Sequence, residues 1–334
     1  MGNTTEDVRI IPADNGAYDV VVVGAGAAGL STALLLARAR RRVAVVDCGN
    51  TRNAAHTHGF ASRDGMAAAD LLAVGRAEIG GHGVDLIKGR IDRIDPGFLV
   101  HLDGGATIGA RRIVMATGLR DELPAIPGVR ELRGSDVLFC LHCHAHEIRG
   151  RPIGVLGTHP GAVRHALLLC QWSYDVVYFP HDRDLAPRDR RDLEAHGVTV
   201  AEGTVKRLVT ENDRLRGVEL VQGRVFPRGA VFVVPATVPH DTPLTGPGCE
   251  RPADGWARTD AAGRTGVFGV WSVGNVADPK ALVITAAIQG AAAAFALDQD
   301  LVSEDLEQAV DTYDTTARTS RDAPRPVPQV PFPS

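Results

Sequence analysis

A glycine-rich turn between a strand and a helix is the feature that most constrains how this chain can fold. Residues Gly24 to Gly29 read GAGAAG; they follow the β-branched run Tyr18 to Val23 and precede the apolar segment Leu30 to Ala39. In such a unit the first glycine permits a tight turn, the second lets the backbone approach a pyrophosphate, and the third lets the helix pack closely on the strand. The pattern predicts a dinucleotide-binding βαβ unit, in which Asp47 at the end of the next strand accepts hydrogen bonds from a ribose.

A second strand and helix pattern starts at Ile153. Ile153 to Leu156 is an apolar strand, Ala162 to Cys170 a plausible helix, and Asp175 to Phe179 a further strand. A chain of 334 residues is long enough for two domains at roughly 150 residues each. The sequence therefore predicts an α/β fold with two Rossmann-like dinucleotide-binding domains.

The charge balance and the hydropathy pattern exclude several functions. The 36 Lys and Arg residues against 40 Asp and Glu give a net charge of −4, which offers no basic surface for nucleic acid. The sequence contains no run of about 18 uninterrupted apolar residues, which a membrane-spanning helix would need. Its N-terminus has no basic segment followed by an apolar one. We therefore expect a cytoplasmic protein that binds neither nucleic acid nor membrane.

Two later segments indicate which dinucleotide is bound. Ala116-Thr117-Gly118 ends a strand, and Gly274-Asn275 follows the strand Phe268 to Val273 and precedes the helix Ile284 to Leu297. Together with GAGAAG they resemble the three-part FAD signature of flavoprotein disulfide reductases, specifically the low-molecular-weight thioredoxin reductases. In that family an acid normally follows the last glycine and holds the flavin ribityl chain, whereas this chain has Asn275.

The resemblance implies FAD as the cofactor and a homodimer as the assembly. The loop after Asp47 would pass near the adenosine and the flavin, and the start of the Ile284 helix would point its free amides at the flavin. The expected cofactor-binding residues are Gly24, Gly26, Ala27, Ala28, Gly29, Asp47, Arg52, Asn53, His58, Ala116, Thr117, Gly118, Gly274, Asn275, Thr285 and Ala286.

The same resemblance sets the expected domain boundaries, with the second domain inserted in the first. Residues 17–122 and 243–305 would form the discontinuous FAD-binding domain, and residues 123–242 a degenerate NAD(P)H-binding-like domain that carries a CxxC motif. Residues 1–16 would be an N-terminal extension. Residues 306–334 would form a proline-rich tail that is extended or disordered, because Arg318 to Ser334 contains five prolines.

The segment Cys140-Leu141-His142-Cys143-His144 carries the chemistry of the sequence. The chain has five cysteines, too few for a disulfide scaffold, but two that are separated by two residues can close a small redox-active ring. A zinc site using Cys140, Cys143, His144 and His146 is an alternative, but no second pair of ligands supports it. Inert buried cysteines are the third reading, and a redox dithiol without a metal is favoured.

The position of this motif assigns roles by resemblance to the thioredoxin reductases. Cys143 would lie nearest the isoalloxazine, and Cys140 would be the outward thiol that exchanges with the substrate. Those reductases have an aspartate directly after the second cysteine, whereas this chain has His144. An imidazole takes a proton from a thiol at neutral pH more readily than a carboxylate does, which favours thiol oxidation.

The second nucleotide turn departs from the pattern that NADPH requires. It reads Gly157-Thr158-His159-Pro160-Gly161-Ala162, so His159 replaces the middle glycine and its side chain would occupy the space of a pyrophosphate. Where a basic cluster would bind the 2′-phosphate, the chain has His181-Asp182-Arg183. Both departures disfavour the binding of NADPH to the second domain.

An FAD protein that keeps its dithiol and loses its reductant site resembles the dithiol oxidases of natural-product pathways, the group that includes the gliotoxin, holomycin and romidepsin disulfide-forming enzymes. It is most like the holomycin type. The resemblance implies oxidation of a small-molecule dithiol, a dithiolopyrrolone such as holomycin or an epidithiodiketopiperazine-like compound, with O2 as acceptor and H2O2 as product. The alternatives are an NADPH-dependent thioredoxin or disulfide reductase and a non-catalytic flavin or redox sensor.

Overall fold

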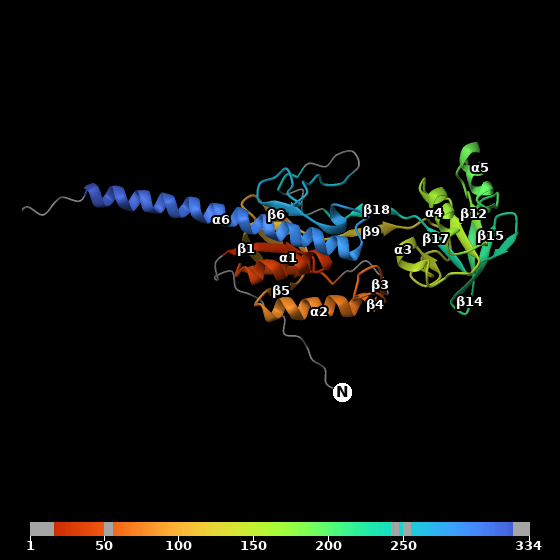
Figure 1. Cartoon of the computed structure of the whole chain (residues 1–334), viewed down its shortest axis with the longest axis horizontal. Helices are drawn as coiled ribbons and strands as arrows, with labels where there is room; N and C mark the ends of the chain where they lie inside the picture. The colour runs from red at the N-terminus through yellow and green to blue at the C-terminus, as the bar shows by residue number, and fades with distance from the viewer. Residues whose placement is uncertain (1–16, 50–55, 242, 244–246, 250–254, 323–334) are drawn as a thin grey trace, which may run out of the picture.

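The computed structural model describes residues 17–49, 56–241, 243, 247–249 and 255–322, and it shows two lobes joined side by side (Figure 1). The chain starts in the first lobe, crosses to the second, and returns to the first. A long C-terminal helix, α6, then projects from the first lobe on the side away from the second (Figure 1).

The first lobe is built on a 7-stranded sheet with the order β5-β2-β1-β8-β7-β6 and β19 paired with β8. The β5, β2, β1, β8 and β19 pairings are parallel, whereas β6, β7 and β8 form antiparallel pairs. The strands are β1 (Tyr18–Val23), β2 (Val43–Asp47), β5 (Asp85–Lys88), β6 (Ile91–Asp95), β7 (Leu99–Leu102), β8 (Thr107–Met115) and β19 (Val270–Ser272). A short antiparallel pair, β3 (His56–Thr57) and β4 (Met66–Ala67), stands beside them.

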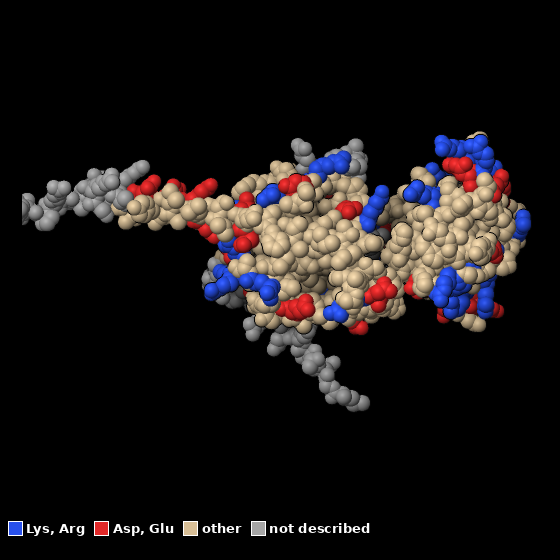
Figure 2. All heavy atoms as spheres, in the orientation of Figure 1, with Lys and Arg blue, Asp and Glu red and all other residues tan. Residues whose placement is uncertain are grey.

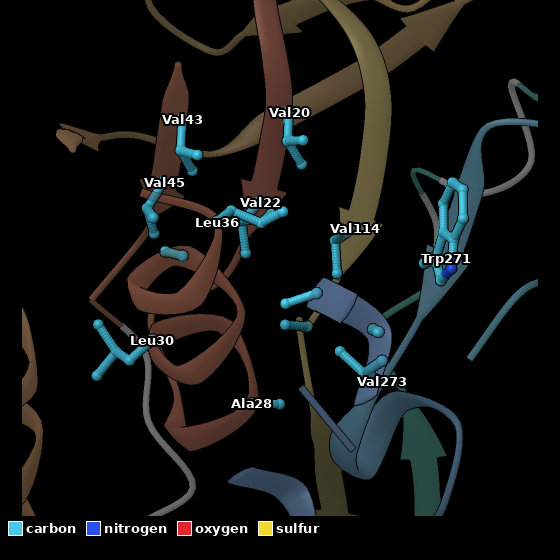
Figure 3. Packing of buried hydrophobic residues seen from close by; sticks show 14 of the residues in the cluster. Val20, Val22, Ala28, Leu30, Leu36, Val43, Val45, Val114, Trp271 and Val273 are labelled. Atoms are coloured by element: carbon cyan, nitrogen blue, oxygen red, sulfur yellow. The ribbon is translucent and has the colours of Figure 1, made fainter. Parts of the chain in front are cut away.

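Helices α1 (Ala27–Arg38) and α6 (Val283–Asp322) cover one face of this sheet, and α2 (Ala68–Gly81) packs beside α1. Their shared core contains Leu30 and Leu36 of α1, valines of β1 and β2, and Trp271 of β19 (Figure 3). Val20, Val22 and Val45 are fully buried in it because parallel strands covered by helices face apolar neighbours. This packing fixes the GAGAAG turn at the end of β1.

The second lobe is built on an all-parallel 5-stranded sheet with the order β10-β17-β11-β12-β13. Its helices are the short α3 (Leu141–His144), α4 (Ala162–Leu169) and α5 (Pro187–Ala195), and a three-stranded antiparallel sheet packs against it. The strands are β10 (Val137–Leu138), β11 (Ile153–Leu156), β12 (Val176–Phe179), β13 (Thr199–Val200), β17 (Ala230–Val233), β14 (Val205–Glu211), β15 (Arg214–Leu220) and β16 (Val225–Pro227).

Two antiparallel strands carry the chain between the lobes. β9 (Leu119–Glu122) leaves the first lobe and pairs with β18 (Ala236–Pro239), which returns to it. The backbone N–H of His240 donates to the carbonyl of Gly118 at 3.0 Å, which closes this ribbon next to the Ala116-Thr117-Gly118 segment. The dithiol lobe is therefore anchored at a segment expected to touch the cofactor.

The element boundaries differ from the sequence prediction at several ends. Helix α1 starts three residues before the predicted Leu30, inside the GAGAAG segment, and β19 is shorter than the predicted strand Phe268 to Val273. The largest error concerns residues 306–322, predicted as part of a tail but helical in the structure. No glycine or proline occurs between Gly290 and Asp322, so nothing in the backbone ends α6 there. Residues 323–334, which hold the prolines, lie outside the described residues.

Ion pairs hold the middle of α6 on the first lobe. Arg41 pairs with Asp298 at 2.7 Å and Asp305 at 2.8 Å, and Arg112 pairs with Asp300 at 2.6 Å and Glu304 at 2.7 Å. Beyond these contacts α6 leaves the body of the protein, and Figure 2 shows acidic side chains on its projecting part. No described helix is long and apolar enough to span a bilayer.

A buried carboxylate stabilises the second lobe. Asp136 is 1% exposed and accepts hydrogen bonds from Arg214 at 2.8 and 3.0 Å, Arg151 at 3.1 Å and the Leu215 amide at 2.9 Å. Burial raises its pKa, but the bonds from Arg214, Leu215 and Arg151 outweigh burial and lower the pKa to about 2.

Because the folded-state pKa of Asp136 lies below its unfolded value, its stabilisation of about 2 kcal/mol is present above pH ~4 and is lost as the pH falls towards 2. We expect Asp136→Asn to lower the free energy of unfolding by at least that amount at pH 6, and by progressively less towards pH 3. Urea titrations at several pH values, with the exposed Asp184→Asn as control, measure the difference. A pH-independent difference between Asp136→Asn and wild type would contradict the role given to this carboxylate.

Candidate functional site

The GAGAAG turn has the close packing that its glycines predict. Gly24 has φ of +107°, and its N–H donates to the Val46 carbonyl at 2.8 Å. A Cβ added at Gly29 would lie 1.9 Å from the carbonyl oxygen of Gly24, so the helix could not approach the strand with any larger residue there. A Cβ added at Gly26 would meet no protein atom within 4 Å. The turn is therefore tight on the protein side and open on the side expected for a pyrophosphate.

The segment after β8 lies next to this turn. A Cβ added at Gly24 would lie 2.5 Å from the Ala116 carbonyl oxygen, and the Ala116 amide donates to Val23 at 2.8 Å. The hydroxyl of Thr117 is buried and has no hydrogen-bond partner among the described residues. The backbone amides of the open turn and the unpaired hydroxyl of Thr117 are hydrogen-bond donors that the phosphates of a dinucleotide would satisfy.

Asp47 ends β2 beside the turn, as predicted, but it has a partner that the sequence did not indicate. Its Oδ2 accepts from Arg76 of α2 at 2.9 Å, and its Oδ1 accepts from the Gly49 amide at 3.1 Å. Carboxylate oxygens can accept more than one hydrogen bond, so Asp47 keeps capacity for a ribose hydroxyl. Arg52 and Asn53 lie outside the described residues.

Asn275 has a structural reason to be an amide. It lies in the short 3₁₀-helix η2 (Gly274–Val276), and its Nδ2 donates to the carbonyls of Asp278 at 3.0 Å and Ala281 at 2.9 Å. These bonds fold the following loop back and leave Oδ1 as the acceptor. Thr285 and Ala286 follow in the first turn of α6, where Ala286 packs near Gly274.

We expect Asn275→Asp to destabilise this loop, because a carboxylate would face two carbonyl oxygens and could donate to neither. Losing both bonds and leaving their acceptors unpaired should lower the free energy of unfolding by about 1–3 kcal/mol. Thermal unfolding with Asn212→Asp in the exposed β14–β15 turn as control measures the effect. Equal stability of Asn275→Asp and wild type would show that the amide is not required.

The two cysteines of the CxxC motif form a disulfide around α3. Cys140 and Cys143 have their Cα atoms 5.2 Å apart, and both are partly buried. Of the other described histidines in this segment, His142 contacts the Trp172 ring and His146 contacts Arg149. No group of three His, Cys, Asp or Glu side chains in the described part of the chain is arranged to hold a metal ion.

His144 is held in a defined tautomer beside the disulfide. Its Nδ1 lies 3.3 Å from the carbonyl oxygen of Cys140; because a carbonyl only accepts, Nδ1 carries the hydrogen and Nε2 is free to take a proton. Burial lowers the pKa of His144, the Cys140 carbonyl raises it, and the positive potential of His58 lowers it further. The net pKa is below the ordinary value, so the imidazole is neutral and basic at pH 7.

The structure places His58 against the dithiol segment of the other lobe. Its ring lies 6.2 Å from the ring of His144, and its Nδ1 lies 3.8 Å from Oε1 of Glu147 and 3.5 Å from Oδ1 of Asp64. The sequence singled out His58 for cofactor binding, which stays a prediction. It did not single out Asp64 or Glu147, and only the approach of the two lobes brings Glu147 to His58.

The second nucleotide turn is filled by its own side chain. His159 Nδ1 accepts a hydrogen bond from the Gly161 amide at 3.0 Å, so the ring occupies the turn and uses an amide at the start of α4. Burial and nearby Arg183 lower the pKa of His159, which keeps the ring neutral. Asp182 accepts from Thr204 at 2.7 Å and lies 3.1 Å from His181. The second turn therefore holds a histidine ring where the first turn is open at Gly26.

Comparison with known proteins places this geometry among redox enzymes. The pyridine nucleotide-disulphide oxidoreductase family matches residues 18–294. The crystal structure of a protein called HlmI is 56% identical, with a TM-score of 0.89 over 92% of this chain and 99% of that one. Thioredoxin reductase tcpT of Claviceps purpurea is 36% identical over 160 residues, which is 45% of this chain and only 50% of that relative.

The fold is also that of the low-molecular-weight thioredoxin reductases. The enzyme from Streptococcus pyogenes superposes with a TM-score of 0.79 at 24% identity, covering 86% of this chain and 99% of that one. The predicted fold class, a mixed α/β protein with parallel Rossmann-like sheets, is confirmed.

Proposed function

The chain belongs to the pyridine nucleotide-disulphide oxidoreductase family, and from this premise we propose that it is an FAD-dependent dithiol oxidase. It closes an intramolecular disulfide in a small-molecule natural product of the dithiolopyrrolone or epidithiodiketopiperazine type, in antibiotic biosynthesis or self-protection. Molecular oxygen is the final acceptor. Members of this family are typically flavoproteins that act on disulfides or thiols.

One contrast between the two lobes carries the proposal. The first nucleotide turn is open at Gly26, whereas the second is filled by His159, whose ring is bonded to the Gly161 amide. The Cys140–Cys143 disulfide is carried by the second lobe, with its neighbour His144 facing His58 of the first. A protein arranged in this way can take electrons from thiols and has lost the cradle through which NADPH would supply them.

The residues of the first lobe would hold FAD by backbone and hydroxyl contacts. The GAGAAG turn, Asp47, Thr117 and Asn275 supply amide donors, a carboxylate, an unsatisfied hydroxyl and an amide oxygen. When bound, FAD supplies the capacity to accept two electrons and to pass them to oxygen.

The dithiol segment performs the sulfur chemistry. His144 takes the proton of one substrate thiol, and the thiolate attacks Sγ of Cys140 and expels Cys143 as a thiolate. The second substrate thiol then attacks the substrate sulfur of this mixed disulfide, which closes the product disulfide and releases Cys140 as a thiol. Reoxidation of Cys140 and Cys143 to their disulfide would pass two electrons to bound FAD, and oxygen would take them from the flavin. Across one turnover the substrate loses two electrons and two protons, and O2 takes up both as H2O2.

A peroxide assay tests the proposal. In air, the yellow protein with a small dithiol such as dithiothreitol should consume one O2 and release one H2O2 for each disulfide formed. NADPH with oxidised thioredoxin should give no turnover. Reduction of thioredoxin at the expense of NADPH would establish the reductase alternative, and no turnover with either pair would leave a redox sensor.

We also propose that two chains associate through an apolar stripe on α6. Ile288, Phe295, Val302, Leu306, Val310 and Tyr313 recur at intervals of three, four or seven residues, so they share one helix face, and each is between 49% and 74% exposed. The acidic residues Asp298, Asp300 and Asp305 pair instead with the arginines of the first lobe. A contiguous exposed apolar face of this length is typical of a protein interface.

We expect the double substitution Leu306→Asp and Val310→Asp to convert a dimer to a monomer, because each carboxylate would be buried unpaired in the interface. Gln308→Asp, which adds one carboxylate away from the stripe, is the control. Light scattering coupled to size exclusion measures the mass. A dimeric double variant would place the interface elsewhere.

A further inference from the structure

A cluster of histidines and carboxylates lies where the two lobes meet at the dithiol. From the second lobe come His144 and Glu147, and from the segment after β3 come His58 and Asp64. The His58 side chain is 13% exposed, whereas Glu147 and Asp64 are 46% and 70% exposed. The cluster therefore runs from the partly buried disulfide to solvent.

A thiol-oxidising site has to dispose of protons as well as electrons. Nε2 of His144 is the free base beside the disulfide, because Nδ1 is bonded to Cys140. Once protonated, His144 sits in a half-buried position that disfavours positive charge, so it must release the proton before the next turnover. Its neighbours in the cluster are His58 and Glu147.

We propose that His58 is a positioning residue that carries the proton from His144 to the carboxylates of Asp64 and Glu147. The centroids of the His58 and His144 rings lie 6.2 Å apart in an edge-to-face arrangement, a separation that one bridging water can span. Nδ1 of His58 faces both Asp64 and Glu147, which can take the proton or give it to bulk water. The proton moves with no change in the electron count, and His58 returns to its starting form.

His58 also links the two lobes at the chemical centre. It belongs to the first lobe, but its contacts with His144 and Glu147 lie on the segment that carries the dithiol. The relay is complete only when the dithiol segment lies against the first lobe. This inference rests on the proposed thiol chemistry but not on the identity of the electron acceptor.

Two measurements on the FAD-bound protein test the relay. The first is a histidine NMR titration without substrate. Because the positive potential of His58 lowers the pKa of His144, His58→Gln should raise it, and the acid limb of the exchange rate should move to higher pH. His56→Gln is the matched control; His56 lowers the pKa of His144 less than His58 does, so its removal should raise that pKa less.

The second measurement is the rate of exchange between the Cys140–Cys143 disulfide and dithiothreitol, followed anaerobically by acid quenching and alkylation of the two thiols. His58→Gln should slow it by about tenfold or more near pH 7, with partial recovery in added imidazole, and His56→Gln should leave it near the wild-type rate. Oxidases and reductases both perform this exchange. The exchange rate therefore tests the relay even if the peroxide assay fails. An unchanged pKa of His144, or an unchanged exchange rate in His58→Gln, overturns the relay.

Discussion

Cys140→Ser is expected to oxidise dithiols at least about a thousandfold more slowly than wild type, because the sulfur that the substrate attacks is gone. It should keep its bound flavin. Cys143→Ser should lose turnover to a similar extent, since no disulfide can then form. Cys170→Ser is the matched control. Its sulfur lies far from the pair in sequence and donates only to Ala166, a bond that a serine hydroxyl can also make.

The two single variants also decide which sulfur faces the substrate. With glutathione disulfide as the probe, Cys143→Ser should form a mixed disulfide at Cys140 quickly, whereas Cys140→Ser should react slowly at Cys143. Mass spectrometry of the intact protein follows both reactions. Faster modification of Cys143, or turnover by Cys140→Ser, would exchange the roles proposed for the two cysteines.

Gly29→Ala is expected to lower the free energy of unfolding by about 3 kcal/mol or more and to yield little yellow protein. The added Cβ would lie 1.9 Å from the Gly24 carbonyl oxygen, and neither backbone segment can move without opening the β1–α1 unit. Denaturant unfolding and the flavin absorbance of the purified protein measure the two effects.

Gly26→Ala separates the cofactor from the fold. Its Cβ would meet no protein atom within 4 Å, so we expect the stability of the flavin-free protein to change by no more than about 1 kcal/mol. The same methyl group would stand where the pyrophosphate approaches, and FAD affinity should fall by about tenfold or more, measured by flavin fluorescence. If Gly26→Ala bound FAD normally, the turn would not be the pyrophosphate site.

Much of the fold could be predicted because its signals are local. The strand before GAGAAG, the glycine spacing and the apolar second unit each depend on neighbouring residues, and β1, α1, β11 and α4 form close to where these patterns indicate. The end of α6 could not be predicted in the same way. Composition after residue 305 suggested a tail, but the backbone continues as a helix for as long as no residue interrupts it.

The motifs of the site could be predicted from the sequence, but the side chains that contact their residues could not. The open side of Gly26 and the filled second turn at His159 agree with the expectations drawn from the glycine pattern. The pairing of Arg76 with Asp47 and the approach of His58 to His144 depend on which segments the fold brings together. No spacing in the chain could indicate them.

The most direct test is the flavin absorbance of the purified protein in the absence of oxygen. Addition of dithiothreitol should bleach the yellow flavin, and addition of NADPH should not. Admission of air should then restore the colour and release one H2O2 for each dithiothreitol oxidised. Rapid bleaching by NADPH would contradict the proposal that this protein is an oxidase fed by thiols.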